Sequence, residues 1–170
     1  MKPILYLETS IISYLAALPS RDLIVAAHQQ ITCEWWAERR DRYELFVSEL
    51  VILEARRGDP NAARRRMAFL DGLKRLSINE QVRFLVKEII KEGCLPIKAE
   101  NDAVHIALAA VHGVDYLLTW NCRHIANALT RQKVTDCCRR HGLVASIIST
   151  PEELPEEENH VERSDCGRDT

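Results

Sequence analysis

Short apolar segments alternate along this chain with longer segments of helical periodicity. The apolar segments have the length of buried strands and cover residues 4–7, 43–47, 73–78, 116–119 and 143–148. The intervening segments place apolar side chains on one helix face, most clearly at 23–40, 80–93 and 100–112. Such alternation favours a parallel sheet with helices on both faces, so we predict an α/β protein with three α/β/α layers.

Acidic and amide side chains cluster near the ends of the predicted strands. Glu8 ends the first strand, Glu54 lies about two turns into the helix after the second, and Asp102 opens the helix before the fourth. Asn121 follows the fourth strand directly. Because parallel strands share one carboxyl edge, these oxygens could surround a hard cation such as Mg²⁺ or Mn²⁺. Each acid taken singly could instead cap a helix or interact with the helix dipole. Glu54 does not suit that role, because it interrupts an apolar helix face.

Four segments, in this order, resemble motifs of the PIN domain family, especially of its VapC-like toxin nucleases. They are residues 6–15 (YLETSIISYL), 48–54 (SELVILE) with Gly58 and Asp59 after it, 102–109 (DAVHIALA) and 119–121 (TWN). The resemblance spans residues 1–150 and implies a PIN-like fold. It also implies an endoribonuclease that depends on Mg²⁺ or Mn²⁺, of the kind that serves as the toxin of a type II toxin–antitoxin pair.

The resemblance implies that Glu8, Glu54, Asp102 and Asn121 are the catalytic and metal-binding residues. Glu8 departs from the family pattern, which usually has Asp there. The added methylene moves the carboxylate by roughly 1.5 Å, which a side-chain rotamer can absorb although Mg²⁺ geometry is strict. Thr9 and Thr119 could orient ligands or water from outside the coordination sphere, with local backbone bonding as the alternative.

Five arginines lie close in sequence to Glu54: Arg56, Arg57, Arg64, Arg65 and Arg66. Their forked donors suit RNA phosphates, although such a run also occurs on solvated helix faces. The partners implied are an RNA substrate, an antitoxin protein and a second copy of the chain in a homodimer.

We interpret the histidines and cysteines as structural residues rather than as ligands or catalysts. Cys137 and His141 share a helix face at i, i+4, but the sequence has no second pair at zinc spacing, so we interpret them as packing residues. His105 and His124 lie near the expected site but within apolar patterns, which favours buried, hydrogen-bonded imidazoles over an acid or a phosphate ligand. The six irregularly spaced cysteines are expected to be reduced thiols.

The formal net charge of -2 divides into about +4 on residues 1–150 and -6 on residues 151–170. The acidic segment has few apolar residues to fold around, so we predict a disordered tail after a nuclease domain that covers residues 1–150. No apolar run approaches the roughly 18 residues of a membrane span, and the first residues lack a signal-peptide pattern. We therefore expect a cytoplasmic protein without membrane contact.

Two other classes of function remain open. One is a catalytically impaired PIN-like domain that binds RNA or protein, which metal-dependent cleavage of RNA would exclude. The other is a phosphoacceptor signalling domain, which would need a lysine at the end of the last strand. That strand ends in residues 147–150 (IIST), without lysine.

Overall fold

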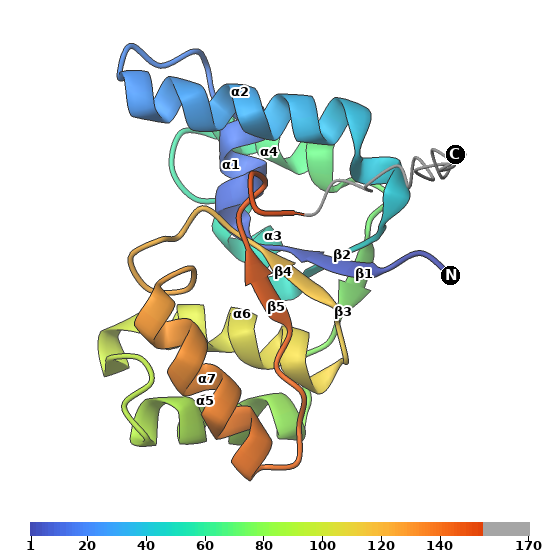
Figure 1. Ribbon diagram of the computed structural model, residues 1–170. Helices are drawn as coiled ribbons and strands as arrows, with labels where there is room; N and C mark the ends of the chain where they lie inside the picture. The colour runs from blue at the N-terminus through green and yellow to red at the C-terminus, as the bar shows by residue number, and fades with distance from the viewer. Residues whose placement is uncertain (155–170) are drawn as a thin grey trace, which may run out of the picture.

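The computed structural model describes residues 1–154, in which five parallel strands form one central sheet (Figure 1). The strands are β1 (Ile4–Leu7), β2 (Glu44–Ser48), β3 (Lys74–Leu76), β4 (Tyr116–Leu118) and β5 (Ile147–Ser149). Their order across the sheet is β3-β2-β1-β4-β5, and every neighbouring pair is parallel. This confirms the predicted α/β class with a central parallel sheet.

Helices cover both faces of the sheet, which completes the three predicted layers (Figure 1). One layer consists of α1 (Thr9–Ala16), α2 (Leu23–Glu38), α3 (Glu49–Ala55) and α4 (Pro60–Leu70). The other consists of α5 (Glu80–Lys91), α6 (Glu100–Val111) and α7 (Ala128–Arg140). Short 3-10 helices lie at Arg40–Arg42 and Ile97–Ala99. The strand order reverses beside β1, and right-handed crossovers on the two sides of that point place their helices on opposite faces.

The central strand β1 is covered on both sides. Leu5, Tyr6 and Leu7 are all 0% exposed, as expected for the middle of a parallel sheet between two helix layers. Leu7 pairs with Leu118 of β4, and the backbone N–H of Glu8 donates to the Leu118 carbonyl at 3.1 Å. The register therefore brings the segments that leave β1 and β4 to the same edge of the sheet.

The helical pattern of the sequence from about residue 122 to 141 predicts a longer last helix than the structure has. It begins at Ala128, because the side chain of Asn127 accepts hydrogen bonds from the backbone N–H groups of Leu129 and Thr130 and so caps it. Residues 121–127 instead form turns, in which the Asn121 carbonyl accepts two backbone hydrogen bonds. This leaves the segment after β4 as a loop beside the site.

The described part of the chain ends in a packed turn at residues 151–154. Leu154 is 2% exposed, and Glu153 forms an ion pair with Arg131 at 2.7 Å. These four residues, which we assigned to the tail, thus contact the body, and the rest of the predicted tail lies outside the described residues. No helix in residues 1–154 is long and apolar enough to cross a membrane.

Candidate functional site

Glu8 joins β1 to α1 and is 6% exposed. Its Oε2 atom accepts hydrogen bonds from the backbone N–H of Ser10 at 3.1 Å, from the Ser10 hydroxyl and from Thr119 Oγ1 at 2.7 Å. Glu8 is therefore also the N-cap of α1. Its Oε1 atom lies 4.0 Å from Nε2 of His105. One carboxylate oxygen is thus fixed by donors while the other faces the site.

Glu54 reaches the same edge from α3. Its Oε2 atom accepts from the Thr9 hydroxyl and contacts His105 Nε2 at 3.2 Å, and its Oε1 atom accepts from Asn101 Nδ2 at 3.1 Å. Burial alone would raise the pKa of Glu54. The pKa is nevertheless lowered to about 2, because the hydrogen bond and charge of His105 outweigh burial. The hydrogen bonds from Thr9 and Asn101 lower it further. Glu54 is therefore a carboxylate at neutral pH.

His105 connects the first two acids to the core. It is 1% exposed, and its ligand atom lies within 4.8 Å of those of Glu8 and Glu54. Its Nδ1 atom is 2.8 Å from the Tyr6 hydroxyl, which in turn is 2.7 Å from Ser48 Oγ. The expectation of a buried, hydrogen-bonded imidazole therefore holds for His105, but one of its partners is a predicted catalytic acid.

Asp102, at the start of α6, has two side-chain partners. Its Oδ1 atom accepts from Asn121 Nδ2 at 3.0 Å, and its Oδ2 atom is 2.7 Å from Nδ1 of His124. Asn121 also accepts from the backbone N–H of His124 at 3.1 Å. Thr119 links this group to Glu8, because its hydroxyl donates to Glu8 and accepts from the Asn121 backbone N–H at 2.9 Å. Asp102 lies outside the group of ligand atoms within 4.8 Å of one another.

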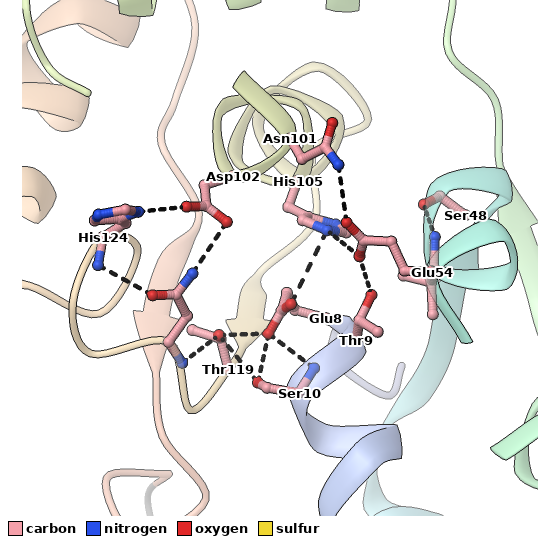
Figure 2. A network of polar contacts seen from close by, with 12 residues as sticks. Glu8, Thr9, Ser10, Ser48, Glu54, Asn101, Asp102, His105, Thr119 and His124 are labelled. Atoms are coloured by element: carbon pink, nitrogen blue, oxygen red, sulfur yellow. Dashed lines mark hydrogen bonds and ion pairs between the residues drawn. The ribbon is translucent and has the colours of Figure 1, made fainter. Parts of the chain in front are cut away.

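The predicted site residues form one polar network (Figure 2). Within it the carboxylates of Glu8, Glu54 and Asp102 point toward one another from three separate elements. In residues 1–154 the ion pairs of these three carboxylates are with His105 and His124, and none is with lysine or arginine. A cluster of carboxylates without a lysine or arginine partner in the described residues is suited to binding a cation.

Thr9 and Thr119 each bond a carboxylate of the site through the side-chain hydroxyl. Sequence reasoning did not identify Ser10 and Asn101, which donate to Glu8 and Glu54 respectively. The position of Ser10, two residues after a capping acid, is a local signal for such a bond. The contact of Asn101 has no local signal, because α3 and α6 meet only in the folded chain.

The five arginines divide into two groups. Arg65 Nε donates to the Ala16 carbonyl at 2.9 Å, at the end of α1, and Arg66 Nε donates to the Ala55 carbonyl at 2.8 Å, at the end of α3. These two side chains thus satisfy carbonyls at helix ends. The other three are exposed: Arg56, Arg57 and Arg64.

Three comparisons place the chain among known proteins. The family model of the PIN domain matches residues 5–126, and no curated protein sequence matches the chain. The VapBC-1 structure from nontypeable Haemophilus influenzae is similar at 19% identity and a TM-score of 0.56, over 88% of this chain and 99% of that chain. VapC20 of Mycobacterium tuberculosis, a sarcin-ricin loop cleaving toxin, is similar at 16% identity and a TM-score of 0.54, over 73% and 95%. At these identities the likeness establishes the fold.

Proposed function

The chain belongs to the PIN domain family, and we propose that it is a divalent-metal-dependent endoribonuclease that hydrolyses RNA phosphodiesters. The observation that carries this proposal is the convergence of Glu8, Glu54 and Asp102 at one edge of the sheet without a lysine or arginine partner in the described residues. The folds of the two VapC neighbours support a role as the toxin of a type II toxin–antitoxin pair.

The donor set fits Mg²⁺ or Mn²⁺. Carboxylate and amide oxygens are the ligands that these hard ions prefer, and Glu54 stays charged at neutral pH because its pKa is lowered to about 2. We assign Glu8, Glu54, Asp102 and Asn121 as the residues that would hold the ion. When bound, such an ion supplies an activated water and neutralises charge on the phosphodiester.

The residues around these ligands would hold them in place. Ser10 and Thr119 fix one oxygen of Glu8, and Thr9 and Asn101 bond Glu54. Fixing the carboxylates before substrate arrives lowers the cost of assembling the site. We further propose that the exposed arginines hold the RNA backbone near the site. They are Arg56, Arg57 and Arg64.

The remaining assignments follow from this function. We propose that the nuclease domain is residues 1–150, that the protein acts in the cytoplasm on RNA, and that its protein partners are an antitoxin and a second copy of itself. A second candidate function is a PIN-like domain that binds RNA or protein without cleaving. Glu8, in the position where the family usually has Asp, is the observation that favours it.

Cleavage assays separate the two functions. The protein should cleave RNA with Mg²⁺ or Mn²⁺ and stop when the metal is chelated. Asp102→Asn should slow cleavage by at least about tenfold with the fold intact, because it removes ligand charge and keeps volume. Glu49→Gln is the matched control, since Glu49 is an exposed acid on α3 whose partner is Arg75 at 3.1 Å. Absence of metal-dependent cleavage would favour the binding domain, and equal cleavage rates for wild type and Asp102→Asn would contradict the assignment of Asp102 as a ligand.

A further inference from the structure

A second group of metal-ligating side chains lies between α5 and α7, which pack against each other in the helix layer that also contains α6. Atoms of Glu92, Cys137 and His141 lie within 4.8 Å of one another. His141 Nε2 lies 3.2 Å from Glu92 Oε1. Three different ligand types, carboxylate, thiol and imidazole, thus face one point.

The spacing on the two helices explains how these residues meet. Cys137 and His141 are four residues apart at the end of α7, and Glu88 and Glu92 are four residues apart at the end of α5. Residues at i and i+4 lie on the same face of a helix, one turn apart. Glu88 Oε2 also approaches His141 Nε2, at 3.6 Å. The second pair that a zinc site requires is therefore present, but it consists of two acids rather than cysteines or histidines.

Neighbouring groups hold these side chains in position. Arg140 forms an ion pair with Oε2 of Glu92, which leaves Oε1 facing His141. Gly93 ends α5 at a φ of 67°, which lets the chain turn, and its carbonyl accepts from Lys133 Nζ of α7 at 3.0 Å. Fixed outer partners of this kind are typical of metal ligands.

The three side chains differ in how far they are buried. Cys137 is fully buried, whereas Glu92 and His141 are partly exposed. Burial raises the pKa of the Cys137 thiol. An ion would enter past the carboxylate and the imidazole and reach a sulfur that water does not contact.

We propose that Glu92, Cys137 and His141 form a structural zinc site, with Glu88 beside it as the candidate fourth ligand. Thiolate and imidazole ligands select Zn²⁺ over Mg²⁺, so this site differs in chemistry from the oxygen ligands near Glu8. Tetrahedral zinc places its ligand atoms about 3.3–3.8 Å apart, which requires side-chain shifts of about 1 Å from the present positions. Bound zinc would tie α5 to α7 beside the segment that leads into α6.

Cobalt(II) is the probe for this site, because sulfur coordination gives a thiolate-to-cobalt charge-transfer absorption that oxygen ligands cannot produce. The reduced full-length protein should bind Co²⁺ with this absorption, and Zn²⁺ should remove it. Cys137→Ser should abolish the absorption, and Glu92→Gln or His141→Gln should weaken Co²⁺ binding at least about tenfold. Cys138→Ser and Cys33→Ser are matched controls that should keep the wild-type affinity. Cys138 is next to Cys137 and also buried, and Cys33 is at an exposed position of α2.

Thermal unfolding provides an independent test. Zinc should raise the Tm of Asp102→Asn by more than that of the double variant Asp102→Asn with His141→Gln, because an ion that binds only the folded state stabilises it and the double variant lacks a ligand at both sites. His141 and Glu92 are partly exposed, so these variants remain informative if Cys137→Ser does not fold. Absence of the charge-transfer absorption in the wild type, or its persistence in folded Cys137→Ser, would overturn the proposal. Neither result bears on RNA cleavage.

Discussion

His105 Nε2 lies 3.2 Å from Glu54 Oε2, although α6 and α3 cover opposite faces of the sheet. A carboxylate can only accept, so the Nε2 atom carries the hydrogen of this bond. On the other side of the ring, Nδ1 lies 2.8 Å from the Tyr6 hydroxyl, which lies 2.7 Å from Ser48 Oγ. Burial raises the pKa of Tyr6, so its hydroxyl keeps its proton. The core thereby holds the ring of the histidine that positions Glu54.

We expect His105→Phe to weaken Mn²⁺ binding by about tenfold, because Glu54 loses the donor that positions it. The matched control is Tyr6→Phe, which removes the far end of the same chain of hydrogen bonds and should weaken binding less than His105→Phe does. Mn²⁺ titrations followed by electron paramagnetic resonance give both affinities. An unchanged Mn²⁺ affinity in folded His105→Phe would show that His105 does not position Glu54 for the ion.

Glu8→Asp should retain most of the activity and stability. Aspartate is a good N-cap, so α1 keeps its cap, and the charge stays at the position where the PIN family usually has Asp. Glu8→Gln preserves side-chain length but removes the charge, and we expect at least a tenfold loss of cleavage rate. Cleavage rates and Tm values of the two variants check this. If Glu8→Asp were as inactive as Glu8→Gln, carboxylate reach rather than charge would limit the site.

Acid should remove the stability that Glu54 contributes. Its folded-state pKa is lowered from 4.5 to about 2, so the unfolded chain takes up the proton first as the pH falls. The contribution is complete above about pH 5 and is lost progressively between about pH 4.5 and 2. Urea unfolding of wild type and Glu54→Gln should therefore give a free-energy difference that is constant above pH 5 and smaller at pH 3. A difference independent of pH would contradict the lowered pKa.

Residues at the ends of strands were the most predictable part of the site. Glu8 and Thr119 directly follow β1 and β4, and parallel pairing fixes the edge at which they meet. His105 gave no such signal, because α6 is buried along most of its length and its pattern is that of a core helix. Contacts between helices were also beyond prediction. Arg65 bonds the Ala16 carbonyl 49 residues away, and nothing local to Arg65 indicates that α1 ends there.

The candidate zinc ligands could also be predicted only in part from the sequence. The pair on α7, Cys137 and His141, is visible in the sequence, but the pair on α5 consists of acids that look like ordinary surface residues. Only the packing of α5 against α7 brings the two pairs together. The spacing of cysteines and histidines therefore does not reveal this group, which depends on tertiary structure.

The neighbouring residues Arg64 and Arg65 should differ in what their removal changes. Arg64 is exposed, so Arg64→Ala should weaken RNA binding and lower the slope of log K against log salt by about 0.7, the loss of one phosphate contact to a single strand. Arg65 is bonded to the end of α1, so Arg65→Ala should reduce the free energy of unfolding by about 1–2 kcal/mol. Fluorescence anisotropy with RNA at several salt concentrations measures the salt slope, in an Asp102→Asn background that limits cleavage. Urea unfolding measures the free energy of unfolding of Arg65→Ala. An unchanged salt slope in Arg64→Ala would mean that Arg64 lies on a solvated helix face and does not contact RNA. A free energy of unfolding equal to that of the wild type in Arg65→Ala would show that the bond to Ala16 adds nothing to stability.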